Sequence, residues 1–368
     1  MRVAVDVSQT CVQRAGCAWH ADACARALAD ALGPENVVLY HHFGEWINLD
    51  TNRGTFIEGC DQPFAGMNPS EAKSAWAAIE RGELALPGAP QIVHSNSFMA
   101  PRIPRAKLVY TIHDLCFWTH PEFTTETNRI LCQRQALKAL RNADAFIFVS
   151  ESSQADFEAL LPGWMSERRR SNAVISLGTR FPARHQTSSA QRFGNSRSPW
   201  LHVGTLEPRK NIIGVLAAYR KYLKHSVVKR PLVFAGASGW LSAAEQQELE
   251  EACETLAVQS LGYVDEEALQ RLYGEAFALL SLSHYEGFGL PICEAGAFAL
   301  PVVARNSPSL EQARRAPESI DPVEEMLELE SAFNKYQEAA QSSSLRSELW
   351  NFSSLAQNLM NLYRLLLA

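Results

Sequence analysis

The stretch Phe277-Ala-Leu-Leu-Ser-Leu-Ser-His-Tyr-Glu-Gly-Phe-Gly-Leu-Pro-Ile-Cys-Glu-Ala-Gly296 contains a strand, a turn and the start of a helix in direct succession. Residues Phe277 to Ser283 form an apolar run of the length of a buried strand. Pro291 stands where a helix takes its first residue, because the N–H that proline lacks has no intrahelical partner there. Strands and helices alternate in this way through most of the chain, which is typical of parallel α/β sheets.

The turn between this strand and helix is suited to an anion. Gly287 and Gly289 remove side chains from the approach to the helix, leaving backbone N–H groups and the positive end of the helix dipole. Glu286 lies in the turn, and Glu294 is predicted to lie in the first turn of the helix. Either glutamate alone would be interpreted as structural, because a carboxylate in a first turn usually complements the dipole. Together with the glycines and the proline, the pair indicates a phosphate site.

Length and composition describe an ordinary globular protein. The chain has 368 residues, 46% of them hydrophobic and 20% charged, which is enough for two domains with sizeable cores. A net charge of −6 argues against a general nucleic-acid binder, which needs a basic excess. Eight cysteines without a Cys-x-x-Cys pair indicate reduced thiols in a cytoplasmic protein. Asp6 interrupts the first apolar run, so we expect no signal peptide, and no run reaches the roughly 18 residues of a transmembrane helix.

The alternation predicts two doubly wound domains. The expected divisions are an N-terminal domain over 1–180, a linker over 181–199, a C-terminal domain over 200–342, and a helical tail over 343–368 that packs back towards the N-terminal domain. The predicted strands are Val3–Val7, Val37–His41, Gln91–His94, Leu108–Ile112, Ala145–Val149, Ala173–Leu177, Trp200–Val203, Leu232–Ala235, Gln259–Val264, Phe277–Ser283 and Val302–Ala304. The predicted helices include Cys17–Leu32, Glu126–Arg141 and Glu151–Leu161. Ligands of such sheets bind at the carboxyl ends of strands.

Two motifs with polar side chains follow predicted strands. His113 and Asp114 end the strand Leu108–Ile112. A lone histidine is more often structural, but this position favours a functional one, with Asp114 orienting the loop or fixing the tautomer of His113. Arg209 and Lys210 follow the strand Trp200–Val203. Such a pair is commonly a solvated surface feature; after a strand it is a candidate for binding a diphosphate, Arg as a planar fork and Lys as a mobile point charge.

Glycine-containing turns give weaker signals. Gly16 follows the first predicted strand, Gly236 follows the strand Leu232–Ala235, and Tyr263 and Val264 end the strand Gln259–Val264. Each is equally compatible with an ordinary turn. The arginine run 168–170, next to Trp164 and Met165, is usually interpreted as solvated surface, although it also allows a small patch for an anionic membrane.

The motifs together resemble a known family. Glu286 to Glu294 resembles the E-x7-E signature of retaining glycosyltransferases with the two-domain GT-B fold, and Tyr285-Glu-Gly-Phe-Gly-Leu-Pro291 with Pro301-Val-Val-Ala304 resembles family 4 of those enzymes. The resemblance implies two Rossmann-like, doubly wound parallel-sheet domains with an interdomain cleft. It covers Gly16 to about Ser309 and is strongest from Gly204 onwards.

The resemblance also implies roles for individual residues. The implied catalytic residues are Glu286, His113, Lys210 and Arg209, and the implied donor-binding residues are Glu294, Gly16, Gly204, Gly287, Phe288, Gly289, Leu290, Gly236, Tyr263 and Val264. In these roles Glu294 binds ribose hydroxyls, Glu286 and His113 bind the sugar, and the two cations neutralise the diphosphate. Three places depart from the family pattern: Ala18 stands where a second glycine is usual, Thr205 where some members have arginine, and Phe298-Ala299 where relatives often carry Cys-Gly or a similar pair.

The implied activity is transfer of a hexose from a nucleotide diphospho-sugar to a hydroxyl, with the anomeric configuration retained. The sequences of the motifs are most similar to those of bacterial mannosyltransferases that build surface polysaccharides. This similarity suggests GDP-mannose as donor and a saccharide or lipid-linked saccharide as acceptor. No Asp-x-Asp pair occurs, so neither a metal nor another cofactor is expected. The expected location is cytoplasmic, with possible peripheral contact at the inner face of the membrane. A GT-B sugar-nucleotide epimerase and an inactive nucleotide-sugar-binding or scaffold protein remain alternatives.

Overall fold

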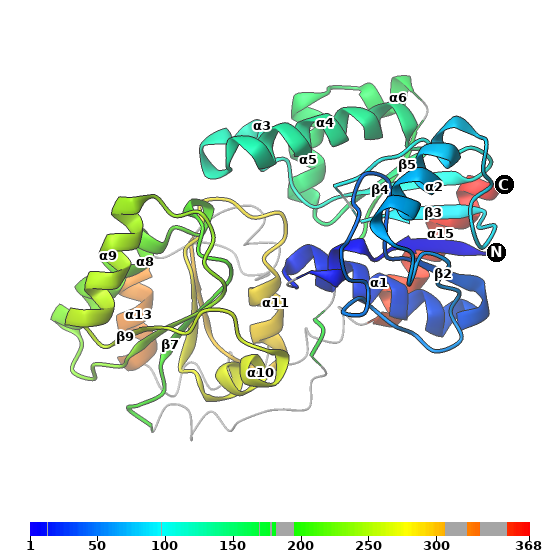
Figure 1. The fold of residues 1–368 in the computed structure, drawn as a ribbon. Helices are drawn as coiled ribbons and strands as arrows, with labels where there is room; N and C mark the ends of the chain where they lie inside the picture. The colour runs from blue at the N-terminus through cyan, green and yellow to red at the C-terminus, as the bar shows by residue number, and fades with distance from the viewer. Residues whose placement is uncertain are drawn as a thin grey trace. The chain divides into compact units, whose positions relative to one another are not determined.

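A computed structural model describes residues 1–12, 14–96, 98–168, 170–176, 179–181, 195–305, 322–331 and 352–368. The chain forms two compact units, each built on one parallel sheet (Figure 1). The first unit comprises Met1–Pro121, Glu126–Leu177 and Asn351–Ala368, and the second comprises Glu122–Thr125 and Gly178–Trp350. The chain therefore passes between the units more than once.

The first unit contains a six-stranded sheet in the order β2-β1-β3-β4-β5-β6. Its strands are β1 Val3–Asp6, β2 Val37–Tyr40, β3 Ile92–Ser95, β4 Lys107–Ile112, β5 Ala145–Phe148 and β6 Ser171–Val174. Its helices are α1 Gly16–Leu32, α2 Pro69–Arg81, α3 Cys116–Thr119, α4 Glu126–Asn142, α5 Glu151–Leu160, α6 Trp164–Glu167 and α15 Phe352–Leu367, with short 3-10 turns at Ser8–Cys11 and Pro34–Asn36. Strand β1 pairs with β2 on one side and β3 on the other, so the winding direction reverses there.

The second unit contains a five-stranded sheet in the order β11-β10-β7-β8-β9. Its strands are β7 Trp200–Val203, β8 Leu232–Ala235, β9 Val258–Ser260, β10 Ala278–Ser281 and β11 Val302–Ala304. Its helices are α8 Ile212–His225, α9 Ala243–Thr255, α10 Glu266–Glu275, α11 Leu290–Ala297 and α13 Pro322–Ser331, with a 3-10 turn at Pro208–Lys210.

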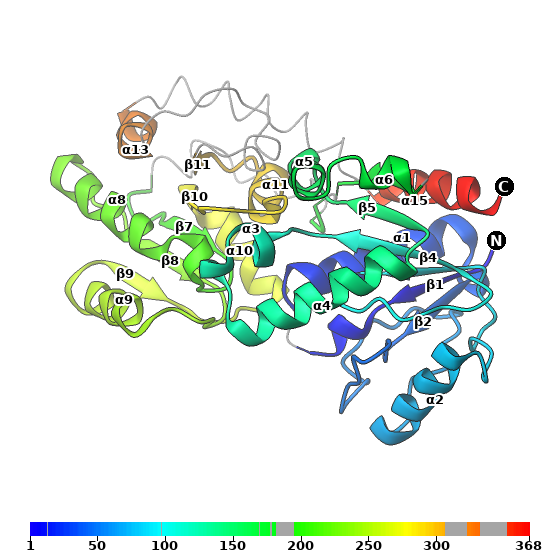
Figure 2. The same ribbon diagram turned by 90° about the horizontal axis from the view of Figure 1, so that it is seen from above.

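Both faces of the second sheet are buried. Successive residues of a strand point to opposite faces, so Trp200 belongs to one hydrophobic cluster and Leu201 to another. Phe234 and Ala235 of β8 are divided between the clusters in the same way. Figure 2 shows α8 on one side of this sheet and α10 and α11 on the other. Continuous apolar strands, rather than alternating ones, are what a sheet covered by helices on both faces requires.

The parallel α/β prediction is confirmed, and three strands of the second unit have the predicted bounds. The strand prediction Gln259–Val264 was too long, because β9 ends at Ser260 and Gly262 adopts φ +67°. In the first unit β6 is Ser171–Val174 rather than Ala173–Leu177; Leu177 lies outside the described residues. Helix α2 was not predicted, although Asn68 and Glu71 form a capping box at its start.

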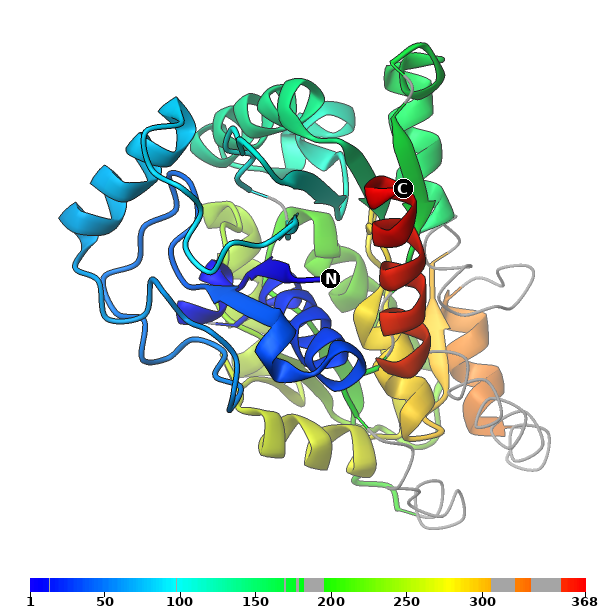
Figure 3. The same cartoon turned by 90° about the vertical axis from the view of Figure 1, so that its right-hand side faces the viewer.

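The helical tail belongs to the first unit. Figure 3 shows α15 beside the sheet of this unit, and α15 contacts α1 and β6. Leu355, Leu359 and Leu362 are buried, and the Tyr363 hydroxyl lies 2.6 Å from His94 Nδ1. Most of the predicted linker lies outside the described residues, while Phe181 is buried in the core of the second unit. Within the described ranges, no helix combines the length and apolar character needed to cross a bilayer.

Removing core contacts of α15 should destabilise the first unit. Leu359 is fully buried, so Leu359→Ala is expected to lower the free energy of unfolding by about 2–5 kcal/mol. Asn358 is exposed on the same helix, and Asn358→Ala should change it by no more than about 0.5 kcal/mol. Urea unfolding followed by circular dichroism measures both; equal effects would show that α15 does not contribute to the core.

Candidate active site

The candidate site of the second unit lies where the winding of its sheet reverses. Strand β7 pairs with β8 on one side and with β10 on the other, so the loops after β7 and β10 are neighbours. The first loop carries Arg209 and Lys210, and the second carries Glu286. In open α/β sheets, ligands bind in the crevice outside the strand ends at this topological position.

The loops after β7 and β8 lie backbone against backbone. Gly204 has φ +144°, a conformation that favours glycine, and its N–H donates to the Ala235 carbonyl at 3.0 Å. A Cβ on Gly236 would lie 1.8 Å from the Gly204 carbonyl oxygen. Only glycine therefore fits at position 236, and this close approach fixes the path of the β7 loop towards Lys210.

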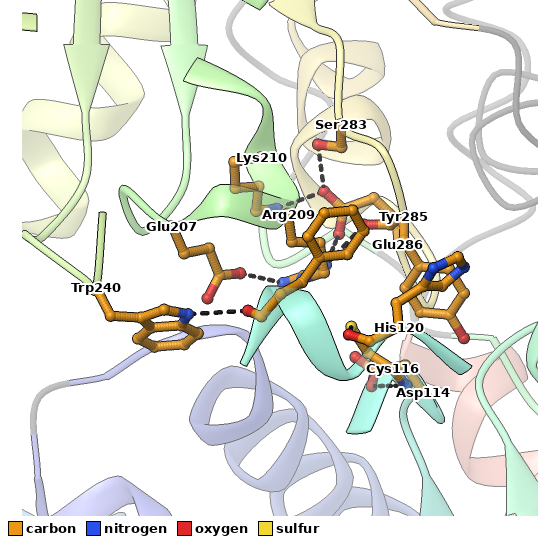
Figure 4. Close-up of polar contacts among 11 residues, drawn as sticks. Asp114, Cys116, His120, Glu207, Arg209, Lys210, Trp240, Ser283, Tyr285 and Glu286 are labelled. Atoms are coloured by element: carbon orange, nitrogen blue, oxygen red, sulfur yellow. Dashed lines mark hydrogen bonds and ion pairs between the residues drawn. The ribbon is translucent and has the colours of Figure 1, made fainter. Parts of the chain in front are cut away.

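The side chains of both loops converge on Glu286 (Figure 4). Arg209 NH1 donates to Glu286 Oε2 at 2.6 Å, and Lys210 Nζ donates to Oε1 at 2.5 Å. The Ser283 hydroxyl donates to the same Oε1 at 2.7 Å. Arg209 is held further by NH2 donating to Glu207 Oε1 at 2.5 Å and NH1 donating to the Tyr285 carbonyl at 3.0 Å. Three residues predicted from sequence are thus brought together in one buried cluster.

The charges in this cluster set its protonation. Burial raises the pKa of Glu286, but the charges of Lys210 and Arg209 outweigh it and lower this pKa to about 2. Burial and the nearby Lys210 charge lower the pKa of His202 to about 4, opposed by its hydrogen bond to the Leu280 carbonyl. At neutral pH the cluster therefore contains an ionised Glu286 beside a neutral His202.

Glu294 occupies a different position from the one predicted. Helix α11 begins at Leu290, one residue earlier than expected, so Glu294 lies beyond its first turn. Glu294 is 4% exposed; its Oε2 accepts a hydrogen bond from the Tyr273 hydroxyl at 2.8 Å, and Arg180 Nε lies 2.8 Å from Oε1. Burial raises the pKa of Glu294 above its usual value, and Arg180 and Tyr273 offset this rise only in part. Arg180 is therefore a largely buried partner of Glu294.

The remaining predicted residues of this unit lie at the start of α11 or in the loop that follows β9. Gly289, with φ +90°, is the residue preceding the helix, Leu290 is its first residue, and Phe288 is buried; Gly287 lies between Glu286 and Phe288. The Tyr263 side chain is 47% exposed, and Val264 is partly buried against the core. Because β9 ends at Ser260, both Tyr263 and Val264 lie in a loop.

The first unit has its own group of polar residues at the ends of β1, β3 and β4. The His113 ring packs edge-to-face on His20, with centroids 4.7 Å apart. His20 Nδ1 lies 2.7 Å from Asn96 Oδ1, and Asn96 Nδ2 donates to the Asp6 carbonyl at 2.9 Å. His94 Nε2 lies 2.8 Å from Thr111 Oγ1. Buried networks of this kind rigidify the groups they contain when their polar atoms are satisfied.

His113 differs from the rest of this network. Its Nε2 is buried and has no hydrogen-bond partner within the part of the chain that the structure describes. Burial lowers the pKa of His113 to about 4, so the ring is neutral near pH 7 and carries one donor and one acceptor. Asp114 Oδ1 accepts a hydrogen bond from the Cys116 N–H at 3.1 Å, which orients the following loop. Gly16 begins α1, and Ala18 is buried in it.

Two family models match the chain in succession. Residues 15–163 match "Glycosyltransferase Family 4", and residues 189–317 match "Glycosyl transferases group 1". The first model spans strands β2 to β5 of the first sheet, and the second spans all five strands of the second sheet, in the order expected for the GT-B fold. The chain belongs to the GT-B glycosyltransferases.

Individual relatives of this GT-B chain agree with that assignment. It is 31% identical to O-antigen chain mannosyltransferase B of Escherichia coli over 224 residues, a match that covers 60% of this chain and 58% of the relative. The chain thus matches little more than half of the length of that relative. Sucrose-phosphate synthase from Thermosynechococcus elongatus has a similar fold, with a TM-score of 0.71 and 18% identity over 100% of this chain and 99% of that one. HepE of Anabaena, solved with UDP-glucose, gives a TM-score of 0.65 and 17% identity over 98% and 99%.

Some contacts of this GT-B chain depend on tertiary packing and have no local signal in the sequence. Tyr273 lies on α10 and Arg180 precedes the second sheet, and nothing in their local sequence indicates Glu294 as a partner. Met165 of the suggested membrane patch is buried, and the Trp164 ring packs against Phe146 and Phe157; Arg169 lies outside the described residues. Among the described residues, no group of three or more His, Cys, Asp or Glu side chains is arranged to hold a metal ion.

The close approach at Gly236 gives a stability prediction. Gly236→Ala forces the β7 and β8 loops apart and should lower the free energy of unfolding by about 3 kcal/mol or more. Gly296 provides the control, because it lies within α11 and a Cβ there meets nothing within 4 Å. Gly296→Ala should be neutral or stabilising by about 0.5–1 kcal/mol. Chemical denaturation distinguishes the two, and an unperturbed Gly236→Ala would contradict the backbone contact.

Proposed function

We propose that the chain is a retaining glycosyltransferase that transfers a hexose, mannose from GDP-mannose, to a saccharide or lipid-linked saccharide during surface polysaccharide synthesis. The observation that carries the proposal is the buried cluster of Arg209, Lys210 and Glu286 at the point where the second sheet reverses its winding. The choice of mannose is supported by the resemblance of the motif sequences to those of mannosyltransferases and by the 31% identity to O-antigen chain mannosyltransferase B.

In this proposal, the two cations bind the diphosphate of the donor. Arg209 is a planar fork held by Glu207 and Glu286, so its orientation is set before a ligand arrives. Lys210 has three N–H donors, one of which is directed at Glu286 Oε1. Their positive charge counters the negative charge that develops on the leaving diphosphate, which is the usual way in which phosphoryl leaving groups are stabilised. Backbone N–H groups at the start of α11 add to this field.

Glu286 and Glu294 would bind different parts of the donor. Glu286 lies in the turn and accepts hydrogen bonds from sugar hydroxyls, and Glu294 lies within α11 and accepts them from ribose hydroxyls. His113 of the first unit would hydrogen-bond the transferred sugar through Nε2, the ring nitrogen without a partner in the described residues. A neutral imidazole suits this role, because it can form a hydrogen bond without placing a charge next to the neutral sugar.

We propose that the configuration is retained, and the low pKa of Glu286 supports this proposal. A general base needs a pKa near the working pH, and Arg209 and Lys210 overcome the effect of burial and hold the pKa of Glu286 at about 2. We propose that the acceptor oxygen attacks the anomeric carbon on the face from which the C1–O bond to phosphate breaks. A phosphate oxygen of the departing nucleoside diphosphate takes the acceptor's proton, so the products are a glycoside of unchanged configuration and the protonated diphosphate.

An assay of the product tests activity and stereochemistry together. With GDP-α-mannose and a mannosyl acceptor, we expect an α-linked product, identified by the one-bond carbon–proton coupling of its anomeric centre. Glu286→Gln should slow transfer by about 100- to 1000-fold, because it removes the charge that pairs with Arg209 and Lys210 and is proposed to bind the sugar in the transition state. Glu248→Gln, which breaks a partly exposed ion pair with Arg220, should leave the rate unchanged. A β-linked product would overturn retention, and release of free nucleotide and altered sugar without acceptor would indicate an epimerase.

The role given to Lys210 predicts independence from divalent metals. Transfer should persist in excess EDTA, while Lys210→Met should lose about 100-fold or more in rate, and added Mg²⁺ should not restore it. Lys221→Met, at an exposed position of α8, is the matched control and should behave as the parent protein. Loss of activity in EDTA with recovery on adding Mg²⁺ or Mn²⁺ would contradict this prediction.

A further inference from the structure

The Glu294 carboxylate is held from two sides. Arg180 Nε lies 2.8 Å from Oε1, and the Tyr273 hydroxyl donates to Oε2 at 2.8 Å. An ionised carboxylate offers about four acceptor positions, so each oxygen of Glu294 retains capacity for one further hydrogen bond. The side chains of Arg180 and Glu294 are only 15% and 6% exposed, so this ion pair is largely shielded from water.

We propose that Arg180, assisted by Tyr273, is a positioning residue of the donor site, which holds Glu294 ionised and oriented for the hydroxyls of the nucleotide ribose. This inference rests on the proposed function, because it takes Glu294 to bind the nucleotide. Arg180 acts through Glu294 and need not touch the substrate itself.

The position of Arg180 is set by the residue that follows it. Phe181 is 2% exposed, and its ring packs against Tyr273 and Phe298 with centroids 6.0 and 5.5 Å away. The Arg180 guanidinium lies over the Phe181 ring, 4.9 Å from its centroid. Because Phe181 is packed in the core of the second unit, it fixes the position of the adjacent Arg180 next to Glu294.

The charge of Arg180 opposes the effect of burial on Glu294. Burial raises the pKa of Glu294, Arg180 and Tyr273 oppose this rise, and the charge on Glu266 adds to it, so the pKa remains above its usual value. When Arg180 is removed, the carboxyl should therefore take up a proton at a higher pH than in the parent protein. A protonated carboxyl has lost an acceptor, so nucleotide binding should weaken as the pH falls, and from a higher pH in the variant.

The experiment measures the affinity for GDP and for UDP by calorimetry between roughly pH 6 and roughly pH 8. This range lies above the usual pKa of a glutamate side chain, so a change of affinity within it reports a carboxyl whose pKa is raised. Arg180→Gln is expected to bind about 10- to 100-fold more weakly than the parent at the lower pH and to recover part of the loss at the higher pH. Arg197→Gln removes the same charge from an exposed position before β7 and should match the parent throughout.

A second substitution separates positioning from general damage. In a Glu294→Gln background, Arg180→Gln should cost little more and the pH dependence should be lost, because both substitutions act through one carboxylate. Tyr273→Phe removes the hydroxyl that donates to Glu294 without altering charge and should shift the pH profile in the same direction by a smaller amount. If circular dichroism shows that Arg180→Gln does not fold, the pH dependence of nucleotide binding by Tyr273→Phe tests the inference instead.

The outcomes separate this inference from the proposed function. If the parent protein binds neither nucleoside diphosphate, the proposed donor site is wrong. If it binds one and Arg180→Gln has the affinity and pH profile of Arg197→Gln, Arg180 is not a positioning residue. Additive losses in the double variant would likewise overturn the inference, because they would show that Arg180 acts independently of Glu294.

Discussion

The second unit is organised by the ion pairing of one buried carboxylate with two cations from a neighbouring loop. Glu286 receives Arg209 on one oxygen and Lys210 on the other, and it lies at the end of a strand paired directly to theirs. Burial alone would favour a neutral acid; the two cations reverse that preference and keep Glu286 ionised. Losing either partner would leave a charge in a poorly solvated position, which is why buried pairs are so sensitive to single substitutions.

The sheet topology brings these groups together without help from long loops. Strand β7 is central, so residues that leave it and residues that leave β10 meet, although they are far apart in the sequence. The same reversal in the first sheet places the ends of β1 and β3 side by side, where Asp6 and Asn96 are joined by a hydrogen bond. Both units thus use the carboxyl ends of parallel strands for their polar residues.

The parallel sheets and the polar cluster at the strand ends of the second unit could be predicted from the sequence. Arg209, Lys210 and Glu286 follow apolar runs whose ends are visible in the sequence, and strand ends converge in a parallel sheet. Arg180 and Tyr273 could not be found in that way, because their contacts with Glu294 depend on tertiary packing, such as that of Phe181 beside Arg180, and not on any local pattern. Helix α2 is a different case, because its capping signal, Asn68 followed by Pro69 and Glu71, is local and visible in the sequence.

The place of α15 has a consequence for how the protein is made. The first unit takes its final helix from residues that follow the whole second unit, and Leu359 and Tyr363 of that helix are fully buried. When the second unit leaves the ribosome, the first unit still lacks this helix, and the surface that α15 will cover on α1 is open. Domains of multidomain chains usually fold in the order of their synthesis. Here the domain that is translated first is the one that is completed last.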